Sequence, residues 1–203
     1  VGVYAIGNPI DVMIDPASDQ ALRAALIKRY GFDRPLFEQY FIFMGNLLRG
    51  DLGESFIYRL PVLGLIFDRL PATLELAVCA MLIATLVGIP LGIWAGYRPD
   101  AVSSKLIMGL SVLGFSVPTF WVGLLLIMTF AVELGWLPSG GRGPVSTVLG
   151  MPLSITSLEG LSHLLLPAFN LALFKLGLLI RLARAGTVEV MSADYVRFAR
   201  AQG

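Results

Sequence analysis

The chain has 203 residues, of which 56% are hydrophobic and 14% are charged, and its formal net charge is +1. A soluble domain has about 25% charged residues, so lipid rather than water is expected to surround much of this chain. The near-neutral charge provides no basic face for phosphate groups, and we therefore expect no nucleic-acid partner.

The N-terminal part is expected to precede the main membrane region. Residues 1–10 are interpreted as the tail of a first transmembrane helix, and residues 11–72 as an extracytoplasmic helical segment. Proline and glycine punctuate this segment as they do at helix ends: Gly31 follows one predicted helix, and Pro35 and Gly50 flank a second.

Three membrane spans are predicted within residues 73–203, at about residues 73–97, 106–132 and 161–183. The first two contain uncharged runs of 20 and 27 residues, and about 20 apolar residues cross the hydrocarbon core. The chain does not begin with Met, and its pattern does not close at the C-terminal end. We therefore expect an all-α, multi-pass transmembrane helical bundle, truncated at both ends.

Basic residues set the expected orientation of these spans. Short loops that are rich in Lys and Arg stay in the cytoplasm. Most basic residues of the membrane region follow the first span or the third span. Residues 98–105 and 181–203 are therefore predicted to be cytoplasmic, whereas residues 133–160 face outward.

The residues of a catalytic or metal site are not recognisable in the sequence. His163 is the single histidine and is interpreted as an interfacial polar residue, so neither a histidine-based triad nor a metal cluster is expected. No glycine-rich loop ends in Gly-Lys-Ser or Gly-Lys-Thr, so the chain is not expected to bind ATP. Cys79 lies in an apolar run and is interpreted as a packing residue. We expect no enzyme activity, no metal and no cofactor in this chain.

Polar residues interrupt the second and third spans. Pro118 removes one backbone hydrogen bond, and nearby hydroxyl groups can satisfy the freed carbonyl, so this break either lines an aqueous path or only bends the helix. Lys175 either reaches the cytoplasmic headgroups or faces a water-filled cavity. The candidate path residues are Ser111, Ser116, Pro118, Thr119 and Lys175. In the first span, Gly88, Gly92 and Gly96 are predicted to permit close helix packing.

Residues 188–203 are predicted to form a short amphipathic helix on the cytoplasmic side. Helical spacing places Tyr195 and Phe198 on one face, with Arg197 and Arg200 beside them. Such a helix either lies on anionic lipid or docks into a groove of a soluble partner, and its composition slightly favours lipid.

Residues 195–203 read Tyr-Val-Arg-Phe-Ala-Arg-Ala-Gln-Gly, which resembles the first half of the cytoplasmic EAA loop of ATP-binding-cassette (ABC) importer permeases. The two alanines and the glycine of that motif fall at Phe198, Ala199 and Gly203. Its glutamate position is Arg197, a departure typical of the peptide-transporter branch. Further segments resemble the B-type permease subunits of dipeptide and oligopeptide importers, in order and over nearly the whole chain: residues 49–53 with Ser55, 69–75, 116–124, 135–138 and 163–168.

The resemblance implies a type I ABC importer permease fold, in the inner membrane of a bacterial or archaeal cell. It implies a membrane-spanning permease subunit of an ATP-driven importer for short peptides or a related small solute, such as a nickel chelate or glutathione. The implied partners are a second permease subunit of the C type, two ATPase subunits that bind ATP and Mg²⁺, and an extracytoplasmic solute-binding protein.

The resemblance also assigns a role to the C-terminal segment, as the start of a coupling helix that sits in a cleft of the ATPase, and so reverses the preference for lipid. The coupling residues are Ala193, Asp194, Tyr195, Val196, Arg197, Phe198, Ala199, Arg200, Ala201 and Gly203. The alternative function is an ion-gradient-driven secondary transporter or a channel subunit. Such a protein would need carboxylates within the membrane, whereas Glu75 and Glu133 lie only at the ends of the predicted spans.

Overall fold

The structure is a computed structural model that describes residues 20–29, 31, 33–55, 57–148 and 150–202. The chain divides into two compact units, residues 1–70 and residues 71–203. The membrane-helix tail expected at residues 1–10 lies outside the described residues.

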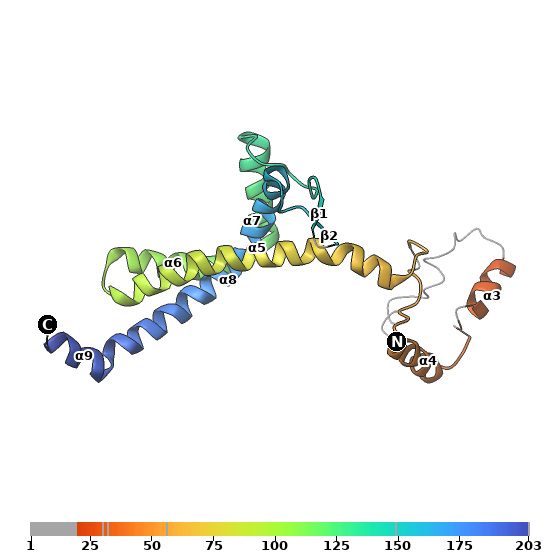
Figure 1. The fold of residues 1–203 in the computed structure, drawn as a ribbon, viewed down its shortest axis with the longest axis horizontal. Helices are drawn as coiled ribbons and strands as arrows, with labels where there is room; N and C mark the ends of the chain where they lie inside the picture. Colours follow the sequence, from red (N-terminus) through yellow and green to blue (C-terminus); the bar gives the residue numbers. More distant parts are fainter. Residues whose placement is uncertain (1–19, 30, 32, 56, 149, 203) are drawn as a thin grey trace. The chain divides into compact units, whose positions relative to one another are not determined.

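The first unit contains two short helices, α3 (Gln20–Arg29) and α4 (Leu36–Leu48) (Figure 1). The proline before α4 has a φ of −55°, which suits the start of a helix, and Gly50 after it adopts a φ of +79°. The second helix predicted from the sequence is thus α4. None of its residues is buried within this unit, and large apolar side chains such as Phe37 and Phe41 are exposed.

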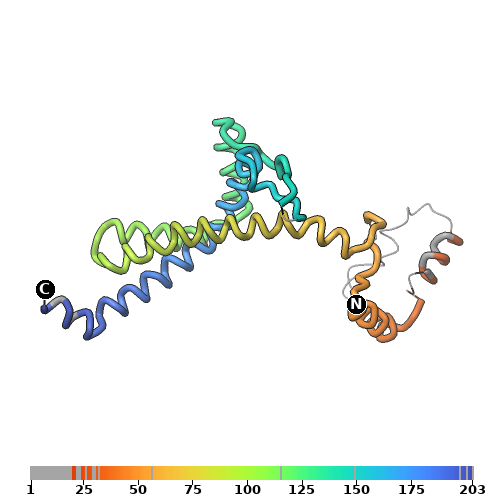
Figure 2. The backbone as a smooth tube through the Cα atoms, viewed as in Figure 1, coloured from red at the N-terminus to blue at the C-terminus, as the bar shows by residue number. Residues whose placement is uncertain are grey.

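A long helix, α5 (Val62–Tyr97), turns back into α6 (Val102–Ser116) through a short connection at residues 98–101 (Figures 1 and 2). Polar contacts hold this turn. The Trp94 Nε1–H donates to the Ser103 Oγ over 3.1 Å, and the Arg98 guanidinium lies 5.2 Å from the centre of the Trp94 ring. The buried Ser104 hydroxyl donates to the Arg98 carbonyl over 2.6 Å.

The second predicted span is broken into separate helices. After α6, Val117 is extended, and Pro118 precedes α7 (Thr119–Leu126), which continues as the π-helix η1 (Ile127–Glu133). The helix before the break (α6) and the helix after it (α7 with η1) are bent by 106° relative to each other. The Leu134 N–H donates to the Thr129 carbonyl, and Gly135 then ends the element with a φ of +61°.

A two-stranded antiparallel hairpin, β1 (Ser146–Val148) and β2 (Met151–Leu153), lies in the segment that the sequence places outside the cytoplasm. It is followed by α8 (Leu158–Ser192) and, after an extended Ala193, by α9 (Asp194–Ala201). The expected helical fold class is confirmed, and the hairpin is an addition that hydropathy did not predict.

Small residues let α5 and α8 pack closely. Alanine and glycine recur at every fourth position on one face of α5: Ala80, Ala84, Gly88, Gly92 and Gly96. Ala80 and Ala84 form a buried cluster with Ala168 and Ala172 of α8. A Cβ added at Gly92 would lie 2.6 Å from both the Ala183 Cβ and the Ile180 carbonyl oxygen, so the helix backbones touch here.

Among the described residues, α5 and α8 are each long and apolar enough to cross a membrane. The bent pair of α6 with α7 and η1 counts as a third span if its halves are taken together. The predicted range 73–97 lies within α5, and the predicted range 161–183 lies within α8.

The close contact at Gly92 generates a stability prediction. Gly92→Ala places a methyl group against the α8 backbone, and we expect a loss of about 1–3 kcal/mol in the free energy of unfolding. Gly109→Ala is the matched control, because a Cβ at Gly109 of α6 would meet nothing within 4 Å. Reversible unfolding in mixed detergent micelles measures both variants, and equal midpoints would contradict the packing described here.

Candidate solute path and coupling helix

Glu75 of α5 is buried, with 4% of its surface exposed, and its carboxylate fastens the segment after η1 to the helix. Its Oε2 accepts hydrogen bonds from the Arg142 Nη2 over 3.1 Å and from the Ser154 Oγ over 2.9 Å. Its Oε1 accepts from the Ser154 N–H and from the Ile155 N–H. A buried carboxylate with four donors is well compensated for its loss of water.

Arg142 ties the hairpin into the same cluster, because its Nη2 also donates to the Pro152 carbonyl. Its side chain is 28% exposed, whereas that of Glu75 is 3% exposed. We call Glu75, Arg142 and Ser154 the outer cluster. The sequence contained two signals for it: Arg142 is the only lysine or arginine between Leu106 and Phe174, and Glu75 stands alone at the end of an apolar run.

The segment around Ser154, which Glu75 binds, also packs on the first turn of α8. Ser157 caps this helix by accepting from the Gly160 N–H over 3.0 Å. A Cβ at Gly160 would overlap the Ser154 carbonyl, so only glycine fits here. The His163 ring packs against the loop at Gly143, since a Cβ at Gly143 would come 2.8 Å from the His163 Nδ1. Its Nδ1 also lies 2.9 Å from the Glu159 carbonyl oxygen, which is compatible with the interfacial polar role predicted for it.

At the break between α6 and α7, the predicted path residues differ in where they lie. Ser111 is buried and donates to the Met108 carbonyl over 2.8 Å, and Ser116 donates to the Val112 carbonyl over 3.3 Å. Both hydroxyls therefore bond back to their own helix. Pro118 caps α7, and Thr119 is its first residue.

Beside this break is a cavity of about 170 Å³, which we call the break cavity. Its lining residues are Leu113, Gly114, Val117, Thr119, Val122, Asn170, Leu173 and Phe174. Of the five predicted path residues, only Thr119 lines it. Lys175 is partly buried elsewhere on α8, and among the described residues no carboxylate lies within ion-pair distance of it. Asn170 was missed from the sequence, where one amide in an apolar run gives little signal.

The helix α9 separates from α8 at Ala193, which is extended with a ψ of 144°. Asp194 stands in its first turn, where a negative charge suits the helix dipole. Tyr195 and Phe198 are 67% and 66% exposed, so the apolar face of this helix is left uncovered by the described residues. The structure does not describe Gly203 or the side chains of Arg197 and Arg200.

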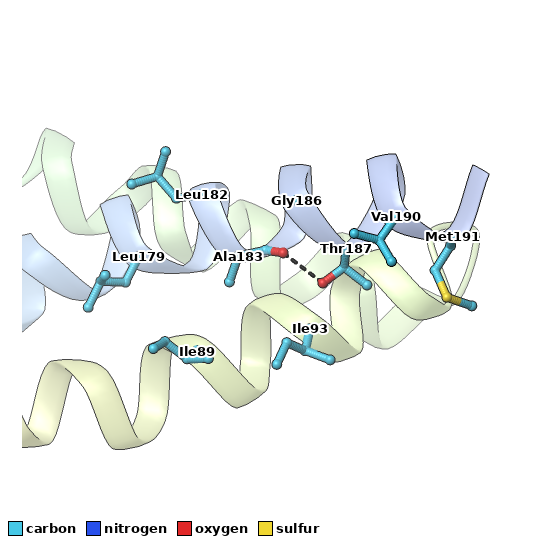
Figure 3. Close-up of a pocket in the computed structure, with 9 residues that line it drawn as sticks. All are labelled: Ile89, Ile93, Leu179, Leu182, Ala183, Gly186, Thr187, Val190 and Met191. Carbon is cyan, nitrogen blue, oxygen red and sulfur yellow. Dashed lines mark hydrogen bonds between the residues drawn. The ribbon is translucent and has the colours of Figure 1, made fainter. Parts of the chain in front are cut away.

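An open groove of about 530 Å³ runs between α5 and α8 near the C-terminal ends of both helices (Figure 3). Its walls are Ile89, Ile93, Leu179, Leu182, Ala183, Gly186, Thr187, Val190 and Met191. The one hydroxyl drawn there, that of Thr187, donates to the Ala183 carbonyl over 2.7 Å. Thr187 carries the only side-chain hydroxyl among these lining residues, and the rest of the lining is apolar, so this groove is a poor candidate for a solute site.

Comparisons with known proteins agree on one family. Residues 88–203 match the family model described as binding-protein-dependent transport system inner membrane component. The chain is 38% identical over 200 residues to the oligopeptide transport system permease protein AppB of Bacillus subtilis, covering 98% of this chain and 61% of that protein. It is 38% identical over 210 residues to the di/tripeptide transport system permease protein DppB of Pseudomonas aeruginosa, covering 97% of this chain and 62% of that protein.

A third similar protein is the dipeptide transport system permease protein DppB of Escherichia coli, 34% identical over 213 residues. That match covers 97% of this chain and 63% of the relative. The chain thus spans about three fifths of the length of these curated relatives.

The outer cluster generates a second prediction. Glu75→Gln removes the charge that Arg142 faces, and a hydrogen bond between charged groups contributes about 1.5–3 kcal/mol. We therefore expect trypsin to cleave after Arg142 at least tenfold faster, as measured by mass spectrometry of the purified protein in detergent.

The exposed pair Arg34–Glu38, with 50% and 51% of its side chains accessible, provides the control. Glu38→Gln should leave cleavage after Arg142 unchanged, since an exposed helical pair contributes only about 0.3–0.5 kcal/mol. Equal cleavage rates in Glu75→Gln and the wild type would show that the outer cluster does not hold the loop.

Proposed function

This chain belongs to the family of binding-protein-dependent transport system inner membrane components, and from that premise we propose that it is the membrane-spanning permease subunit of an ATP-driven importer of short peptides. The observation that carries the proposal is α9, an amphipathic helix with Tyr195 and Phe198 exposed at the end of a long apolar helix. The names of the similar proteins, all permeases of peptide transport systems, support peptides as the solute.

In this proposal, α9 is the start of the coupling helix and docks in a cleft of an ATPase subunit. Two ATPase subunits bind ATP and Mg²⁺, a C-type permease subunit completes the path, and an extracytoplasmic binding protein delivers the solute. This chain itself needs no cofactor. Exposed aromatic side chains on a short helix are the kind of surface that a groove on a partner recognises.

The proposed orientation follows the basic residues, with residues 98–105 and 181–203 in the cytoplasm. The outer cluster and the hairpin then lie on the opposite side, where the binding protein would rest. The break at Pro118 contributes to the solute path, with Thr119 as the predicted path residue that lines a cavity. Ser111, Ser116 and Lys175 remain candidates for the path in a different conformation or against the second subunit.

The ion-driven alternative has less support. The family description names a binding protein as part of the transport system, and a gradient-driven carrier does not need one. In addition, the carboxylate of Glu75 is occupied by Arg142 and Ser154, which makes it a poor proton relay.

The coupling role generates a third prediction. Phe198→Asp places a charge on the exposed apolar face of α9, and desolvating that charge in a docked interface is unfavourable. In the complete protein, expressed with its partner subunits, we expect at least a tenfold loss of ATPase subunits in affinity pull-downs through the permease.

Leu158→Asp is the matched control, because Leu158 is 88% exposed at the opposite end of α8. It should retain the ATPase subunits at the wild-type level. Retention by Phe198→Asp as well would mean that α9 is not the docking element.

A further inference from the structure

The connection between α5 and α6 carries two basic side chains that no other described residue neutralises. We call residues 94–105 the basic turn. Arg98 and Lys105 are both exposed, and neither is in an ion pair or a side-chain hydrogen bond with another described residue. Asp100 is the one acidic residue of the basic turn and is exposed as well, so two basic residues against one acidic residue leave an excess of one positive charge.

Contacts within the basic turn hold the Arg98 guanidinium in place. It lies 5.2 Å from the centre of the Trp94 ring, and the Trp94 Nε1–H donates to the Ser103 Oγ over 3.1 Å. The Arg98 carbonyl accepts from the buried Ser104 hydroxyl over 2.6 Å and from the Ala101 N–H over 3.2 Å. An exposed guanidinium that is already positioned loses little conformational freedom when it binds a partner.

The position of the basic turn on α5 places its cations at the level of the lipid headgroups. The uncharged run at residues 76–95 is long enough to cross the hydrocarbon core, and Arg98 is the first charged residue after it. Trp94 and Tyr97, at the end of this run, are 45% and 56% exposed. Tryptophan and tyrosine favour the boundary between hydrocarbon and headgroups, because their rings are apolar and carry one polar group. The chemistry of this level therefore favours a negatively charged partner that belongs to the membrane.

We propose that the basic turn binds the phosphate group of an anionic phospholipid, with the Arg98 guanidinium donating to the phosphate oxygens and Lys105 adding positive charge. The planar fork of a guanidinium matches two oxygens of a phosphate group. An anionic lipid is favoured over a zwitterionic one, because the amine of a zwitterionic headgroup brings a further positive charge next to Arg98 and Lys105. The bound lipid fixes the depth of the connection between α5 and α6. This inference depends only on α5 as a membrane span and not on the solute or the energy source.

A photoactivatable lipid measures the occupancy of the basic turn. The full-length protein with its partner subunits is placed in lipid nanodiscs that contain phosphatidylglycerol or phosphatidylcholine, each with a diazirine beside the glycerol group. Mass spectrometry quantifies the labelling of peptides from residues 94–105. In the wild type we expect phosphatidylglycerol to label these peptides at least fivefold more than phosphatidylcholine. In Arg98→Gln we expect this ratio to fall about fivefold, the equivalent of about 1 kcal/mol for one basic residue near anionic headgroups.

Further variants separate the fork of Arg98 from its charge and from its support, and keep the test decisive if Arg98→Gln does not assemble. Arg98→Lys keeps the charge and should keep part of the preference. Trp94→Leu removes the ring beside the guanidinium and should lower the preference, whereas Asp100→Asn removes the acid and should raise it. Arg49→Gln is the matched control, because it removes an exposed arginine from the first unit and should leave the ratio unchanged.

Two results would overturn the lipid site. One is equal labelling by the two lipids in the wild type, and the other is an unchanged ratio in Arg98→Gln. If Arg98→Gln instead loses ATPase subunits in pull-downs while its lipid ratio stays at the wild-type value, the basic turn is a contact for the ATPase and not for lipid. Failure of the proposed function is read separately, because the labelling needs neither ATP nor a solute.

Discussion

The arrangement of residues 71–203 depends on the direct backbone contact between α5 and α8. Apolar side chains gain little by leaving lipid, so helices in a membrane associate through close packing rather than through the hydrophobic effect. Gly92 and Gly96 provide that closeness: a Cβ at either would come 2.6 Å from an atom of α8. Ala80 and Ala84 continue the same face toward the outer cluster. With this contact fixed, Glu75 on α5 is held where the segment before α8 can reach it.

The helix α8 connects the outer cluster, the break cavity and α9. Its first turn seats the segment that the outer cluster fastens, its middle contributes Asn170 to the break cavity, and its last residue leads into α9. In the proposed function, a displacement of α9 by the ATPase is therefore applied to the same helix that lines the solute path. Ser157, which caps its first turn, and the extended Ala193 mark the two ends of this element.

The sequence predicted the features that depend on local chemistry. Proline and glycine marked α4, and the glycines of α5 marked its packing face. The amphipathic pattern of residues 188–203 marked α9, but its start was wrong, because residues 188–192 continue α8 and the new helix begins at Asp194. The outer cluster was not predicted, because Glu75 and Ser154 are 79 residues apart and only the fold brings them together. Hydropathy treated residues 106–132 as one span, and Pro118 predicted a break in it but not that the two halves would be bent by 106°. The unpaired Oδ1 of Asn170 was invisible for a related reason, because its burial depends on the helices around it.

Peptide uptake by the complete complex in sealed vesicles tests the proposed function most directly. The vesicles contain the full-length permease with its partner subunits, and binding protein with bound peptide is added on the outer side. We predict that accumulation requires hydrolysable ATP on the cytoplasmic side and is unaffected by collapse of the proton gradient. Accumulation without ATP, driven by an imposed proton gradient, would contradict the assignment of this chain to an ATP-driven importer.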